Sequence, residues 1–121
     1  MELQLIKNLI NIYFISKLLH WNATNNYADH LLYDRISEDC IGFVDKIAEN
    51  CILPFETTVL NRLELYGAVT PSVEDLKNLI IDSANIIQTL CANNEISEGA
   101  KNTLSGIAES LNTKAYLLKD K

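Results

Sequence analysis

Apolar residues recur at spacings of three and four along most of the chain, rather than at every second position. This period is typical of amphipathic helices, and only four Gly and two Pro interrupt it. The pattern predicts an all-α fold with long helices over 3–20, 27–51, 73–91 and a stretch that includes 100–118. A short helix over 55–66 separates the second from the third. This order is that of one four-helix bundle domain, residues 1–121, with one long crossover.

Polar and helix-breaking residues mark the ends of these elements. The stretch Asn22 to Asn26 predicts the first loop, and Pro54 stops the second helix from continuing unbroken. Ser72, with Asp75 three residues later, is a predicted N-cap of the third long helix. Asn93 and Asn94 together separate the third long helix from the fourth.

The positions predicted to be buried form one stripe on each helix. They are Leu5, Ile6, Leu9, Ile10, Tyr13, Phe14 and Leu18 in the first helix, and Leu31, Ile36, Ile41, Val44, Ile47 and Ala48 in the second. In the third they are Leu76, Leu79, Ile80, Ala84, Ile87 and Leu90, and in the fourth Ala100, Thr103, Leu104, Ile107, Leu111, Ala115 and Leu118.

Composition and charge exclude several classes of protein. The chain of 121 residues is 48% hydrophobic, so it can bury a core, and its net charge of −6 disfavours binding to nucleic acid or anionic lipid. Three cysteines, Cys40, Cys51 and Cys91, fit neither a metal-ligand spacing nor a disulfide framework, which indicates buried thiols in a reducing compartment. No signal peptide or membrane-spanning run is present, so we expect a soluble cytoplasmic protein, in the host cytoplasm if the Asn- and Ile-rich chain is phage-encoded.

The candidate chemistry lies around the two histidines, His20 and His30, at the first interhelical junction. At ~100° per residue, Asp34, Asp45 and Glu49 lie within about 100° of His30 around the second helix. This stripe includes Ile41, so it is predicted to lie where an amphipathic helix buries apolar side chains, and buried carboxylates need a charged partner or a metal.

One helix cannot bring both halves of this stripe to one ion. Asp34 and Asp45 are separated by roughly 16 Å of helix, at ~1.5 Å per residue. A second copy, antiparallel across a two-fold axis near residues 39 and 40, would place its Asp45 opposite Asp34. The spacing therefore predicts a homodimer with His20, His30 and Asp34 from one chain and Asp45 and Glu49 from the other. These nitrogen and oxygen ligands suit iron or zinc.

The same residues resemble those of the Dps mini-ferritins, in the segments His20-Trp21-Asn22, His30 to Asp34 and Asp45 to Glu49. In that family, a His-Trp dipeptide, a His-x3-Asp and an Asp-x3-Glu form an inter-subunit ferroxidase site. The resemblance implies a ferritin-like bundle, assembly into a hollow dodecamer, oxidation of Fe(II) with peroxide or oxygen, and storage of the ferric product. Short phage-encoded proteins of unassigned function share the His-Trp-Asn start. The interval from His20 to His30 is shorter than in the family, and a lysine-rich DNA-binding tail is absent.

Several alternatives stay open. The chain is either this ferroxidase or a helical homo-oligomeric interaction protein that retains a structural or vestigial metal site, and DNA compaction through Lys114, Lys119 and Lys121 is disfavoured by charge. Trp21, Tyr27 and Tyr33 are core aromatics in one interpretation and oxidisable groups in another, of which packing is the commoner. Asp82, Glu95 and Glu98 are solvated acids or line an iron entry pore, and Glu38 and Asp39 face solvent or support the ligands.

Overall fold

Four long helices make up most of the computed structural model, which describes residues 2–52 and 72–121. They are α1 (Glu2–Asn22), α2 (Tyr27–Ile47), α4 (Val73–Cys91) and α5 (Glu98–Leu118), and α2 continues into the π-helix η1 (Ala48–Ile52). These two ranges contain no strand. The predicted all-α fold is confirmed, whereas the short helix predicted over 55–66 lies outside the described residues.

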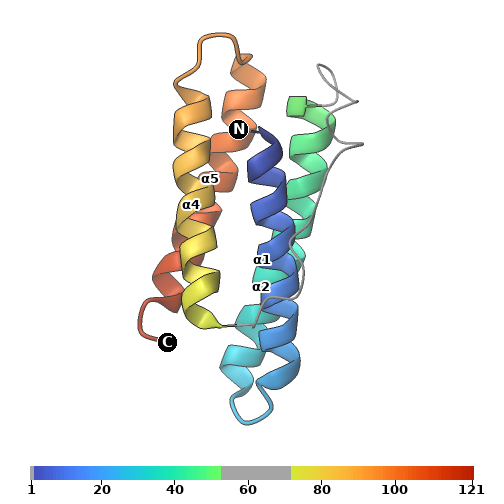
Figure 1. The fold of residues 1–121 in the computed structure, drawn as a ribbon, viewed down its shortest axis with the longest axis vertical. Helices are drawn as coiled ribbons and strands as arrows, with labels where there is room; N and C mark the ends of the chain where they lie inside the picture. The colour runs from blue at the N-terminus through green and yellow to red at the C-terminus, as the bar shows by residue number, and fades with distance from the viewer. Residues whose placement is uncertain (1, 53–71) are drawn as a thin grey trace.

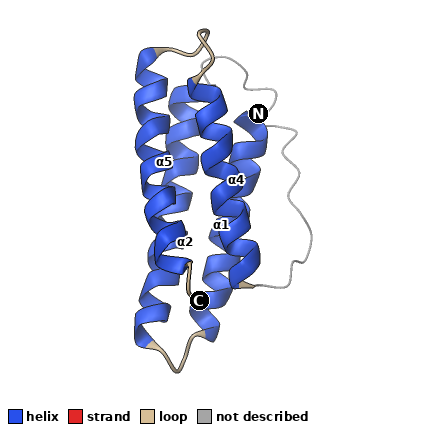
Figure 2. Ribbon diagram, turned by 90° about the vertical axis from the view of Figure 1, so that its left-hand side faces the viewer, coloured by secondary structure: helices blue, strands red, loops and turns tan. Residues whose placement is uncertain are grey.

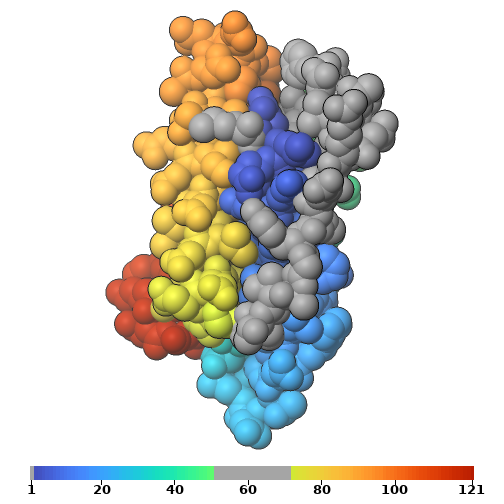
Figure 3. Space-filling model, in the orientation of Figure 1, coloured from blue at the N-terminus to red at the C-terminus, as the bar shows by residue number. Residues whose placement is uncertain are grey.

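The helices form a bundle in which α1 packs on α2 and α4, and α5 packs on α4 and α2 (Figure 1). Two orthogonal views show α1 and α5 running in one direction and α2 and α4 in the other (Figures 1 and 2). On one face of the molecule the side chains of α4 lie beside those of α1 (Figure 3). Since η1 ends at one end of the bundle and α4 begins at the other, the chain forms a four-helix bundle with one long crossover connection.

Three of the helices begin at a capping side chain. The side chain of Asn26 accepts a hydrogen bond from the backbone N–H of Asp29, and Ser97 accepts one from Ala100. The Ser72 hydroxyl accepts one from the N–H of Asp75 at 3.0 Å, which confirms the predicted cap. Each bond satisfies a backbone donor that the first helical turn leaves free.

The core confirms the predicted faces of α4 and α5 better than those of α1 and α2. Leu76, Ile80, Ile87 and Leu90 of α4 are buried, and so are Ala100, Leu104, Ile107, Leu111 and Leu118 of α5. Three predicted core residues are instead exposed: Phe14 at 52%, Leu31 at 48% and Ile41 at 37%. The core takes Ile12 and Ile15 of α1 instead, because α1 carries apolar residues on more than one side and only one side faces the bundle. No described helix is long and apolar enough to cross a membrane.

An ion pair between a buried lysine and a partly exposed aspartate joins α2 to α5. The Lys114 ammonium, on a residue only 6% exposed, donates to Asp39 Oδ2 at 2.7 Å and to Ser110 Oγ at 2.8 Å. The Asp39 side chain is 43% exposed, so it partly faces solvent, as one of the two predictions has it, and it is paired with Lys114. Cys40 next to it is fully buried, which raises the pKa of its thiol to about 12 and keeps it protonated. Cys91 is half-buried and also a free thiol, while the side chain of Cys51 lies outside the described residues.

Replacing Asp39 by Asn is expected to lower the free energy of unfolding by about 1–3 kcal/mol, because the Lys114 ammonium is then buried beside a neutral amide. Lys114→Met is expected to change it by less than about 1 kcal/mol, since the partly exposed Asp39 carboxylate can turn to water and the methionine fills the apolar space. Urea unfolding followed by circular dichroism measures both variants. Equal losses in the two would contradict this asymmetry.

Candidate metal centre

His20 and His30 are held together by reciprocal hydrogen bonds to each other's backbone. His20 Nδ1 lies 2.7 Å from the carbonyl oxygen of His30, and His30 Nδ1 lies 2.8 Å from that of His20. The two rings are stacked, with centroids 3.8 Å apart. Because a carbonyl oxygen only accepts, the proton of each neutral ring lies on Nδ1, and the lone pair lies on Nε2. Both Nε2 atoms are therefore in the form that binds a metal, and backbone carbonyls are common partners of such histidines.

The short connection between α1 and α2 produces this arrangement. The C-terminus of α1 ends at Asn22, and the capping residue Asn26 starts α2 only four residues later. This tight turn places the last turn of α1 against the first turn of α2, and the two helices pack along each other. The prediction that the loop brings His20 and His30 to one place is therefore confirmed.

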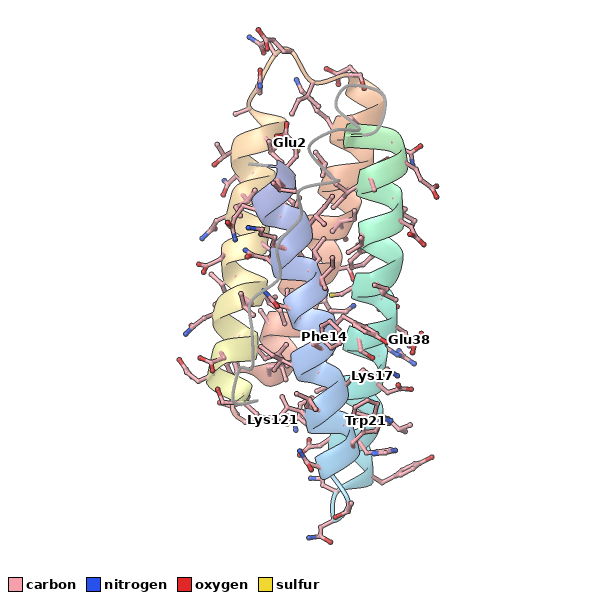
Figure 4. The ribbon with its side chains drawn as sticks, turned by 45° about the vertical axis from the view of Figure 1, so that its right-hand side comes forward. Glu2, Phe14, Lys17, Trp21, Glu38 and Lys121 are labelled. Carbon is pink, nitrogen blue, oxygen red and sulfur yellow. The ribbon has the colours of Figure 1, made fainter. Side chains whose placement is uncertain are left out.

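Asp34 approaches the histidines but is held by a lysine. Its Oδ1 lies 3.8 Å from His20 Nε2 and 2.9 Å from the ammonium of Lys17, one helical turn before His20. The same ammonium lies 2.9 Å from Glu38 Oε1 (Figure 4). The hydrogen bond from Lys17 holds the pKa of Asp34 below its usual range, so Asp34 is ionised at neutral pH. Lys17 was not predicted from the sequence. Glu38 was predicted to face solvent or to support the ligands, and its contact with Lys17 was not.

Asp45 and Glu49 do not join the histidines within one chain. Asp45 lies further along α2 and Glu49 lies in η1, and both are exposed. Among the residues that the structure describes, no group of three or more His, Cys, Asp or Glu side chains is placed to hold a metal ion. Within one chain the rings of His20 and His30 are stacked and Asp34 approaches His20, whereas Asp45 and Glu49 lie elsewhere. The division of the ligands between two chains stays a prediction.

The predicted stripe of ionisable residues does not lie on the buried side of α2, where the sequence analysis placed it. The buried side of α2 consists of Tyr33, Ile36, Ser37, Cys40 and Ile47. His30 and Asp34 are half-buried beside α1, and Ile41 and Asp45 are exposed. The prediction that these ionisable side chains lie on the core side is wrong. They border the surface of the α1–α2 pair, where a second chain can reach them.

Exposed apolar side chains lie on both of the helices that the Lys17–Asp34 pair joins. Phe14 and Trp21, the latter 63% exposed, lie on α1 before and after Lys17 (Figure 4). Leu31 and Ile41 are exposed on α2. We call the surface formed by Phe14, Trp21, Leu31 and Ile41 the outer face. Isolated exposed apolar residues are normal, whereas several on one pair of helices are more typical of a contact surface.

Trp21, Tyr27 and Tyr33 were interpreted either as core residues or as oxidisable groups, and the structure separates them. Tyr33 is buried, so the packing interpretation is confirmed for it. Tyr27 is 74% exposed and stacks on His30 with ring centroids 6.3 Å apart, and Trp21 is also exposed, so neither is a core residue of the single chain. The acids Asp82, Glu95 and Glu98 are exposed, and a pore that they could line needs further subunits.

Compared with models of known protein families and with curated proteins, the chain matches none. The resemblance to the Dps mini-ferritins therefore rests on the motif residues between His20 and Glu49.

Proposed function

We propose that the protein is a Dps-like ferroxidase that binds Fe(II) between two chains and oxidises it with peroxide or oxygen. The observation that carries this proposal is the histidine pair. Both rings are fixed through Nδ1 to backbone carbonyls, which leaves the Nε2 of each ring free, and the Nε2 of His20 lies 3.8 Å from the ionised carboxylate of Asp34. A nitrogen ligand and an anionic oxygen ligand therefore lie close to each other in one chain, which supports a metal site completed by a second chain.

A second copy supplies what the single chain lacks. If two α2 helices pack antiparallel about residues 39 and 40, Asp45 and Glu49 of the partner subunit approach His20, His30 and Asp34. The outer face of each chain is covered in the same contact, which removes its exposed apolar side chains from water. The site and the apolar surface therefore call for the same partner, a second copy of this chain.

The donor set fits Fe(II) as a substrate. Neutral imidazole nitrogens and carboxylate oxygens are ligands for iron and zinc, and five of them from two chains would leave positions for an oxidant. Two Fe(II) ions give one electron each to hydrogen peroxide, which takes up two protons and leaves two Fe(III) ions and two waters. The protein binds and orients the ions. Storage of the ferric product, which the family resemblance implies, requires a closed shell such as a dodecamer.

Anaerobic titration of the wild-type protein with Fe(II), followed by peroxide, tests the proposal. We expect saturable binding of one or two ions per site and rapid appearance of the ferric absorbance. Asp34→Asn is expected to weaken binding by about tenfold or more, because it removes an anionic ligand. Asp82→Asn, which removes an exposed carboxylate of α4, is the matched control. Equal binding in the two variants, or oxidation as fast as in a buffer blank, would refute the assignment.

One observation favours a second candidate, a homo-oligomeric interaction protein with a vestigial site. Lys17 already supplies a positive charge to Asp34 and Glu38, so these carboxylates are neutralised without a metal. In that case the outer face binds a partner, and the titration above shows no saturable uptake. DNA binding gains no support, because Lys114 is buried and Lys121 pairs with Asp29.

A further inference from the structure

The Lys17 ammonium contacts two carboxylates, of which only one belongs to the proposed metal site. It lies 2.9 Å from Asp34 Oδ1, which belongs to the proposed ligand set, and 2.9 Å from Glu38 Oε1, which does not. The Lys17 side chain is only 17% exposed, whereas that of Glu38 is 61% exposed. Lys17 thus lies in the seam between α1 and α2, with Asp34 on the side of the histidines and Glu38 one helical turn further along α2.

A divalent cation and this ammonium compete for the same oxygen of Asp34. Asp34 Oδ1 is the atom nearest to His20 Nε2, at 3.8 Å, and it is also the atom that Lys17 contacts. Two positive charges on one carboxylate oxygen repel each other strongly in a partly buried seam. A cation bound at Oδ1 therefore requires Lys17 to leave that atom, and an ammonium left without any anionic partner in such a place pays a desolvation cost.

We propose that Glu38 is a positioning residue that retains Lys17 while a divalent cation occupies Asp34. This inference rests on the proposed metal site. Since the ammonium already contacts both carboxylates, it can release Asp34 by a small movement toward the more exposed Glu38, without being left unpaired. Lys17 lowers the affinity of the site for cations, and Glu38 reduces that penalty. Their effects on metal binding are therefore opposite in sign, and the effect of Glu38 depends on Lys17.

Zinc titration by calorimetry on a double-mutant cycle tests this coupling. Relative to the wild type, we expect Glu38→Gln to weaken Zn²⁺ binding about tenfold and Lys17→Met to strengthen it about tenfold, the range of coupling between charged neighbours. In the Lys17→Met background, adding Glu38→Gln is expected to change the affinity by less than about twofold. Lys101→Met, which removes the ammonium paired with Glu98 on α5, is the matched control and should bind zinc like the wild type.

A second readout follows the lysine itself. Nuclear magnetic resonance couplings across hydrogen bonds from the Lys17 ammonium are expected to report both carboxylates in the metal-free protein and Glu38 alone after saturation with zinc. If Glu38 had a purely structural role, the two single substitutions would not have opposite effects on zinc affinity. Lys17 would also not change its hydrogen-bond partners when zinc binds.

The possible results separate this inference from the proposed function. If zinc binds and Asp34→Asn abolishes binding, but Glu38→Gln binds like the wild type, the role of Glu38 is refuted and the metal site stands. An equal loss from Glu38→Gln with and without Lys17 makes Glu38 a direct ligand, which also overturns the inference. If the wild type binds no more zinc than Asp34→Asn, the proposed metal site and the role of Glu38 both fail.

Discussion

Mixing two defective variants, His20→Ala and Asp45→Asn, is expected to restore iron binding in about a quarter of the sites. Each variant alone is expected to lose at least about tenfold to a hundredfold in affinity, since the loss of a ligand costs no less than the loss of its supporting partner. In a mixed dimer, one site carries both lesions and the other carries neither. If chains exchange at random after joint refolding, half of the dimers are mixed, and anaerobic Fe(II) titration counts the intact sites.

The matched control is a mixture of His20→Ala with His30→Ala. Both lesions then lie in the same half of the site, so every site in every dimer lacks a histidine and no recovery is expected. Recovery in this control, or its absence in the first mixture when both chains are folded and dimeric, would show that the ligands are not divided between chains as proposed.

The substitution Ile41→Glu is expected to raise the dissociation constant of the dimer about 10–100-fold. Ile41 is 37% exposed on the outer face. In an antiparallel contact about residues 39 and 40, position 41 of one chain lies opposite Glu38 of the partner subunit. The new carboxylate therefore meets a like charge and also removes apolar contact area. Sedimentation velocity over a range of concentrations measures the change, and iron affinity is expected to fall with dimerisation.

Two variants separate this effect from a general loss of solubility or stability. Ile81→Glu places the same charge on α4, where Ile81 is 48% exposed, and is expected to leave the mass of the assembly unchanged. Ile41→Lys loses the same apolar area but places a positive charge opposite Glu38, so it is expected to weaken the dimer less than Ile41→Glu. If Ile41→Glu and Ile81→Glu sediment alike, the outer face is not the dimer contact.

Sequence periodicity predicted the faces of α4 and α5 because their apolar residues occupy one side of each helix. On α1 it was right for Leu5, Ile6 and Leu9 and wrong for Phe14, because the buried side of α1 also includes the polar residues Asn8 and Ser16. These are tolerated in the core since they are satisfied locally: Asn8 accepts from Gln4 at 2.8 Å, and Ser16 donates to the carbonyl of Ile12 at 2.6 Å. A search for apolar periods rejects such positions, and it assigned exposed Phe14 to the core instead.

Only the part of the candidate site that depends on contacts between neighbouring segments of the chain was predictable. The proximity of His20 and His30 follows from a short loop between two helices, which the sequence shows. The position of Lys17 between Asp34 and Glu38 depends on the register of α1 against α2, and that register is set by packing along the whole pair. The side of α2 on which the stripe lies depends on the placement of α5, to which the Lys114–Asp39 pair ties α2.

The acceptors that orient both imidazole rings are main-chain carbonyls, and this has an evolutionary consequence. No point mutation can delete a carbonyl oxygen, so the tautomer of each histidine is inherited with the helical hairpin itself rather than with a third conserved side chain. Selection needs to preserve only the two histidine codons and the approach of the two helices. The side chains of the loop residues between them, apart from the capping Asn26, make none of the hydrogen bonds that set this arrangement, and relatives with different loop sequences are expected to present the same pair of nitrogen ligands.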